Sequence, residues 1–241
     1  MKTPPDFTAL WVYLATSPLL WLTVTLIAYA FADRLSAAAN RHPLVNPVMI
    51  AVAALAGILL LTGTPYQTYF EGAQFVHFLL GPATVALAVP LHNNWPQLRR
   101  ALLPIIAALL AGGLTAVLTA VGIAIAFGLP QSVVAALAPK SVTAAIAMGI
   151  AREIGGEPSL TATLVIATGI LGAVIVTPLM NVLRITDWRA RGFAAGIASH
   201  GIGTARAFQV NKLAGAFASI AMGLNGLLTA LIVPALLAWL K

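Results

Sequence analysis

The longest apolar runs of this chain contain no charged residue. Residues 101–127 and 159–183 lack aspartate, glutamate, lysine and arginine altogether. About 20 apolar residues in a helix cross the hydrocarbon core of a bilayer, and only helices or closed barrels satisfy the backbone there. Charged residues make up 8% of the chain, against about 25% in soluble domains. Because the alternating pattern of barrel strands is absent, we expect an all-α integral membrane protein.

Polar breaks divide the chain into apolar segments, which predict roughly seven to nine membrane segments in one polytopic domain, residues 1–241. The segments lie near 10–32, 46–63, 75–91, 101–127, 132–151, 159–183, 193–208 and 214–240. Lysine and arginine gather in several breaks, as is typical of cytoplasmic loops. If segment 132–151 enters and leaves on one side, the basic break 184–191 also falls in the cytoplasm. The net charge of +7 therefore indicates membrane orientation, and we expect no nucleic acid partner.

Two segments are interrupted by proline in the same way. The stretches GPATVALAV (81–89) and APKSVTAAI (138–146) both place proline second, a hydroxyl residue fourth and valine fifth, a possible internal repeat. Proline suits the first position of a helix, so we expect Pro82 and Pro139 to begin second half-helices. The free N–H groups of such an end attract anions, and discontinuous helices in corresponding positions are typical of transporters. The alternative is a pair of ordinary proline kinks in spanning helices.

Lys140 stands beside the second interruption with no basic cluster next to it. A charge at the bilayer centre costs at least about 2.5 kcal/mol, which proteins normally tolerate only for function. We therefore expect Lys140 to bind an anionic substrate. The further substrate-binding candidates are hydroxyl residues and prolines at the two breaks: Ser141, Thr143, Thr84, Pro139 and Pro82. The alternative is a lysine that reaches the membrane surface from a loop between two short helices.

A second polar cluster, ASHGIGTARA, lies within segment 193–208. Histidine changes charge near neutral pH, so His200 is the candidate for proton coupling. Arginine binds carboxylates bidentately, which makes Arg206, with Ser199, a candidate for substrate binding. The alternatives are a cytoplasmic helix end at Arg206 and a hydrogen bond from His200 to a carbonyl. The candidates for packing or hinge roles are small or carry an amide: Gly81, Gly201, Gly203 and Asn225.

This cluster does not predict an enzyme. Ser199 and His200 are adjacent in sequence, whereas a catalytic triad needs groups that converge in space around an orienting carboxylate. The four histidines are scattered and the chain has no cysteine. We therefore expect no catalytic residue, no metal site and no cofactor.

Taken together, the motifs resemble the LrgB/CidB family. The resemblance lies in YFEGAQFVHFLLGPATVALAVPL (69–91), LAPKSVTAAIA (137–147), GGEPSLTATLVIATGILGAV (155–174), ARGFAAGIASHGIGTARA (190–207) and GAFASIAMGLNGLLTALIVP (215–234). Ala144 and Ala145 stand where the family usually has Thr-Pro, and Gly201 where it often has alanine. The resemblance implies a multi-pass protein of the bacterial inner membrane.

What the resemblance implies about function is divided. Bacterial members are described as antiholin-like regulators of murein hydrolase export and cell lysis, working with a small LrgA/CidA-type membrane partner. Plant relatives resemble plastid glycolate/glycerate transporters, and some bacterial pairs are linked to pyruvate uptake. The residue chemistry favours a proton-coupled, alternating-access transporter of such small carboxylates, with the lysis regulator as the alternative. The expected partners are the lipid bilayer, a small organic anion and an LrgA/CidA-like protein, and a homo-oligomer is left open.

Overall fold

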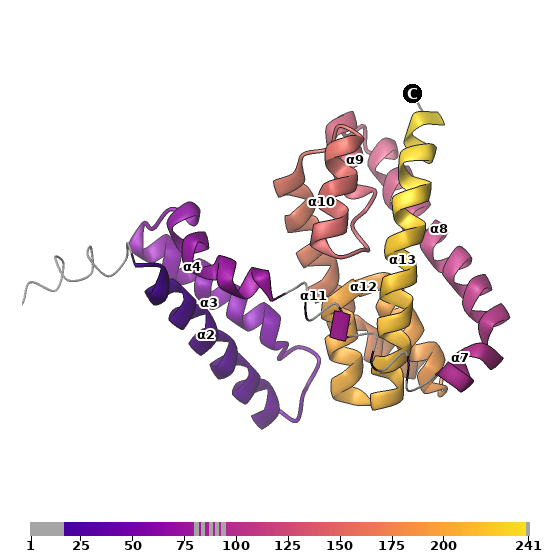
Figure 1. The fold of residues 1–241 in the computed structure, drawn as a ribbon, viewed down its shortest axis with the longest axis horizontal. Coiled ribbons are helices and arrows are strands. Elements are labelled where there is room, and N and C mark those ends of the chain that lie inside the picture. Colours follow the sequence, from indigo (N-terminus) through magenta and orange to yellow (C-terminus); the bar gives the residue numbers. More distant parts are fainter. Residues whose placement is uncertain are drawn as a thin grey trace, which may run out of the picture. The chain divides into compact units, whose positions relative to one another are not determined.

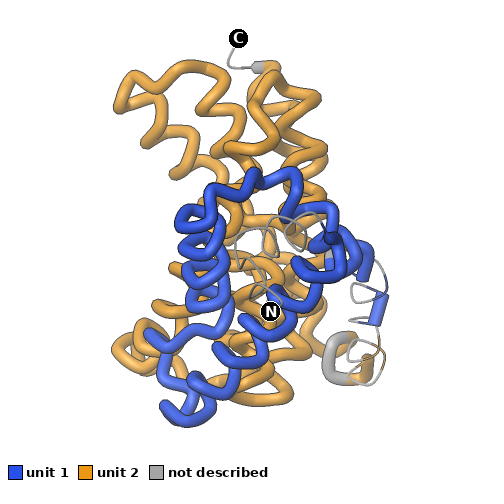
Figure 2. Tube along the Cα trace, turned by 90° about the vertical axis from the view of Figure 1, so that its left-hand side faces the viewer, with its two compact units in different colours: residues 1–86 blue, residues 87–241 orange. Residues whose placement is uncertain are grey.

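The computed structural model describes residues 17–79 and 95–239, together with residues 82, 85, 86, 89 and 92. Every regular element in this part of the chain is a helix, which confirms the predicted all-α membrane class (Figure 1). The chain divides into two compact units, Met1–Ala86 and Leu87–Lys241 (Figure 2).

The first unit contains α2 (Pro18–Ala38), α3 (Pro47–Thr62) and α4 (Tyr66–Phe78). Helix α2 is long and apolar enough to cross a membrane, and α3 is a shorter apolar helix. Both helices begin with proline, whose missing N–H is not needed at a helix start.

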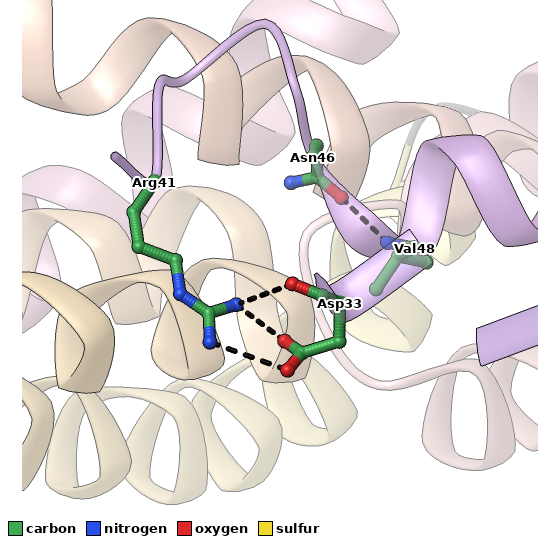
Figure 3. A network of polar contacts seen from close by, with 4 residues as sticks. All are labelled: Asp33, Arg41, Asn46 and Val48. Carbon is green, nitrogen blue, oxygen red and sulfur yellow. Dashed lines mark hydrogen bonds and ion pairs between the residues drawn. The ribbon is translucent and has the colours of Figure 1, made fainter. Parts of the chain in front are cut away.

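Polar side chains fix the connection between α2 and α3. Arg41 forms an ion pair with Asp33 across the connection (Figure 3). The side-chain oxygen of Asn46 accepts hydrogen bonds from the N–H groups of Val48 at 2.9 Å and Met49 at 3.1 Å. These bonds satisfy N–H groups that the first turn of a helix leaves without partners.

The second unit contains the remaining described helices and the two polar stretches around Lys140 and His200. Its helices are α7 (Trp95–Arg100), α8 (Leu102–Ala126), α9 (Gln131–Leu137), α10 (Ala144–Glu153), α11 (Pro158–Val182), α12 (Trp188–Val210) and α13 (Lys212–Trp239). Three of them, α8, α11 and α13, are long and apolar enough to span a membrane. They correspond to the segments predicted near 101–127, 159–183 and 214–240.

Helix α12 is broken in its middle and folds back on itself. Ser199 (φ −134°, ψ 17°) and His200 (φ 40°, ψ −132°) have non-helical backbone angles. A Cβ on Gly203 would lie 2.7 Å from the carbonyl oxygen of Ala195, although eight residues of straight helix would separate their Cα atoms by about 12 Å. We call residues 188–198 the first arm of α12 and residues 201–210 the second arm.

The first arm packs against α13 in parallel register. A Cβ on Gly192 would lie 2.0 Å from the Ala214 carbonyl oxygen, and one on Gly196 would lie 2.1 Å from that of Ala218. The absence of side chains on the two glycines lets the backbones touch, as at small-residue interfaces between membrane helices. The chain thus runs along the first arm, returns along the second, and continues in α13 beside the first.

Candidate functional site

Hydrogen bonds from α13 and from the second arm hold the break in α12. The Asn225 side chain donates to the Ile197 carbonyl at 3.2 Å, a group that an unbroken helix would bond to residue 201. Thr204 donates to the His200 carbonyl at 2.8 Å. Asn225 thus satisfies a carbonyl that the break releases.

His200 lies buried against α11. Its Nε2 atom is 2.9 Å from the Val165 carbonyl oxygen, and because a carbonyl only accepts, Nε2 carries the proton of this bond. This is the carbonyl hydrogen bond that was the alternative for His200. A Cβ on Gly169 of α11 would lie 2.6 Å from the His200 ring, so a glycine is needed where the ring packs.

Two buried oxygen atoms at the break have no hydrogen-bond partner among the described residues: Ser199 Oγ and Asn225 Oδ1. The Ser199 side chain is 0% exposed and that of Asn225 is 1% exposed. The two oxygens lie against different helices, since Cβ atoms on Gly172 of α11 and Gly113 of α8 would lie 1.7 Å and 3.0 Å from them respectively.

The second break lies between α9 and α10, where the prediction that Pro139 begins a helix is wrong. Helix α10 begins at Ala144, with Thr143 as its N-cap residue. Residues after the proline make turns, because the N–H of Lys140 bonds to the Leu137 carbonyl at 3.1 Å and that of Val142 to the Pro139 carbonyl at 3.2 Å. The helix start is therefore displaced from Pro139 to Thr143.

Lys140 lies in these turns and is partly buried. Its ammonium nitrogen is 3.4 Å from the hydroxyl oxygen of Ser141, which is buried. The ion pairs found among the described residues, Arg41 with Asp33 and Arg189 with Asp187, do not include it. The side chain of Thr143 makes no capping hydrogen bond at the start of α10. Lys140 lies three residues before this helix end, which favours anions.

The chain returns to α9 after α10. A Cβ on Gly156 would lie 2.8 Å from the Ala136 nitrogen. The residues before and after the segment that carries Lys140 therefore lie next to each other, as the two arms of α12 do.

Val165 of α11 connects the two breaks. It forms one buried cluster with Val142 and Ala147 from the α9–α10 side, and its carbonyl oxygen bonds to His200. Lys140 and His200 thus lie on segments that meet the same residue of α11, and this arrangement could not be seen from sequence spacing.

The other sequence candidates lie elsewhere. Arg206 is 7% exposed and lies six residues beyond the break, beside Trp188 and Ala195 of the first arm. Pro82 has helical backbone and is exposed, within the first unit. Gly81 and Thr84 lie outside the described residues. Their roles, and those of the other candidates, stay predictions.

The hinge in α12 falls on Ser199 and His200, whereas Gly201 and Gly203 were expected to provide it. Gly203 instead lets the first arm approach closely, while the nearest contact of a Cβ on Gly201 would be an ordinary 3.9 Å from Met222. Among the described residues, no three side chains of the metal-ligating types gather into a possible metal site.

A groove that sequence reasoning missed lies between α8 and the first arm of α12. Its volume is about 890 Å³. Arg100, Asp187 and Arg189 lie along it with Thr115 and many apolar residues. Asp187 caps α12 through the Arg189 N–H at 2.8 Å, and its hydrogen bonds with Arg189 hold the pKa of its carboxyl below the ordinary value. The sequence feature that could have indicated this groove is that two basic breaks each precede an apolar helix.

Comparison with known proteins identifies relatives along nearly the whole chain. The model of the LrgB-like family matches residues 25–239. An uncharacterized protein of Bacillus subtilis, YwbG, is 35% identical over 221 residues, covering 91% of this chain and 97% of that protein. The holin-like protein CidB of Staphylococcus aureus is 32% identical over 219 residues, covering 91% and 95%.

CidB of Staphylococcus epidermidis, also named a holin-like protein, is 31% identical over 221 residues, covering 90% of this chain and 95% of the relative. No solved structure matches the chain. Together with the long apolar helices, these matches place the chain in a bacterial membrane, which it crosses several times. The chain belongs to the LrgB-like family.

Proposed function

We propose that this chain is an antiholin-like regulator of murein hydrolase export, acting with a small LrgA/CidA-type membrane protein. The observation that carries the proposal is the match to a relative named a holin-like protein, at 32% identity over 95% of that relative. The relatives' names favour this role over the carboxylate transport that the residue pattern placed first.

The test compares host cells that lack the chain with cells in which it is restored. Murein hydrolase activity in the culture supernatant is measured by zymography at equal cell density. We expect release to rise without the chain and to fall on restoration, only when the partner is present. Equal release from both strains overturns the proposal.

The geometry favours a second candidate function, transport of a small carboxylate. The supporting observation is that two returning segments meet at Val165, one carrying Lys140 and the other His200. The ammonium of Lys140 has three donors, of which the contact with Ser141 at 3.4 Å engages one. The remaining donors can bind a carboxylate, and the start of α10 adds a favourable dipole.

In this function His200 would carry the coupled proton. Its ring nitrogen already donates to the Val165 carbonyl, so a change in its charge would act directly on α11. Helix ends and unwound backbone at membrane depth are the elements from which secondary transporters build substrate and ion sites.

The transport test uses purified chain in proteoliposomes, with radiolabelled glycolate or pyruvate and with or without a pH gradient. Uptake stimulated by the gradient should disappear in Lys140→Ala and persist in Lys212→Ala, which removes an exposed lysine at the start of α13. His200→Gln should abolish the stimulation by the gradient. No uptake after co-reconstitution with the small partner, or equal uptake by both lysine variants, refutes this second function.

A further inference from the structure

The groove between α8 and the first arm of α12 has no part in the roles above. Its walls are apolar over most of their length, formed by Ile105, Ala108, Ala111, Phe193, Ile197 and Phe217. Charged side chains line it as well, namely those of Arg100, Asp187 and Arg189. A small hydrophilic carboxylate would leave most of these walls without a partner, so the groove suits a different ligand.

The charges lie at one end of the groove. Both helices enter it from their N-termini, since Arg100 precedes α8 and Arg189 lies in the first turn of α12. The lining then follows both helices to Ala116 and Ala198. The distance along α8 from Leu102 to Ala116 is about 21 Å at 1.5 Å per residue. This length exceeds the depth of one leaflet, about half of a 30 Å hydrocarbon core.

The charged end carries a net positive charge from two arginines and one aspartate. Arg189 directs Nε and Nη2 to the carboxylate of Asp187, with its shortest hydrogen bond at 2.6 Å. Its Nη1 group has no hydrogen-bond partner in the described part of the chain, and the same holds for the Arg100 side chain, which is exposed. An anion at this end would therefore meet two guanidinium groups with donors to spare.

We propose that the groove binds an anionic phospholipid, with one acyl chain along α8 and the phosphate between Arg100 and Arg189. Arginine matches phosphate geometry with paired hydrogen bonds, and basic pockets between membrane helices bind acidic lipid headgroups. The groove and the lipid are complementary in two ways. The apolar part of the groove fits the acyl chain, and its positive end fits the headgroup. The lipid would fill the space between α8 and α12 and hold the first arm in place.

The experiment uses the full chain purified in detergent, with phosphatidylglycerol or phosphatidylcholine of identical acyl chains added. Native mass spectrometry counts retained lipid, and thermal unfolding reports its effect on Tm. Phosphatidylglycerol should be retained and should raise Tm more than phosphatidylcholine does. Arg100→Gln should weaken phosphatidylglycerol binding about fivefold, given the contribution of one basic residue near a lipid surface. Arg152→Gln, an exposed arginine at the end of α10, should not.

A second pair of variants tests the apolar part of the groove. Ala108→Phe places a ring in the groove, whereas Ala107→Phe changes the preceding exposed residue, which does not line it. Only Ala108→Phe should abolish lipid retention. Equal binding of the two lipids, or equal retention by the two phenylalanine variants, overturns the proposal. A wild-type dimer without lipid that Ala108→Phe dissociates would also overturn it, because the groove would then hold a second copy.

Discussion

Replacing Gly196 with alanine should separate the first arm of α12 from α13. The added Cβ would lie 2.1 Å from the Ala218 carbonyl oxygen and 2.9 Å from its carbonyl carbon, whereas ordinary contact begins at 3.4 Å. The obstructing atoms are backbone, so no side-chain rotation relieves the clash. Overpacking of this kind costs roughly 1–3 kcal/mol.

The assay is thermal unfolding of the purified chain, with Gly223→Ala as the matched control. Gly223 lies on α13, and a Cβ there would meet nothing within 4 Å, so this variant gains only helix propensity. Since 1 kcal/mol shifts Tm by about 2–4 °C in a chain of this size, Gly196→Ala should unfold roughly 2–12 °C below the control. If the two variants unfold at the same temperature, the close parallel packing of the first arm on α13 is incorrect.

Two further substitutions each remove a side chain that hydrogen-bonds to the backbone of a helix. Asn225→Leu removes the donor to the Ile197 carbonyl at 3.2 Å and should destabilise the chain by about 0.6 kcal/mol, and at most about 1.7, in a denaturation series; unchanged stability would show that Asn225 does not support the break. Glu157 accepts hydrogen bonds from Ser159 and from the Leu160 N–H at the start of α11, and these bonds lower its pKa. Its stabilising contribution is therefore present above the pKa of the unfolded chain and is lost as pH falls through the lower pKa of the folded chain. Glu157→Gln should flatten this acid-side loss of Tm, and a curve that matches the wild type would contradict the cap.

The long helices could be predicted because their signal is local. Helices α8, α11 and α13 follow from uncharged apolar runs long enough to cross a bilayer. The interruption near Pro139 was also visible, because proline and Lys140 conflict with an uninterrupted membrane helix. Its details were not, since backbone hydrogen bonds extend the turns to Thr143 before α10 begins.

The break in α12 depends on residues distant in sequence. Local preference would place the unusual backbone on Gly201 or Gly203, yet the positive φ falls on His200. The reason lies on other helices, where Gly169 makes room for the ring and Asn225 satisfies the released carbonyl. No spacing within 193–208 carries that information.

The groove was missed for a related reason. Arg100 and Arg189 belong to separate basic breaks, which a charge rule interprets only as orientation signals. In the folded structure α8 and the first arm of α12 lie side by side, and the two arginines therefore line the same groove.

The most direct test of the central claim is murein hydrolase release from host cells that lack this chain and are supplied with wild type or Lys140→Ala. A regulator that acts through its partner predicts high release without the chain and restored restraint by both versions. Release that stays the same with and without the chain would contradict the claim.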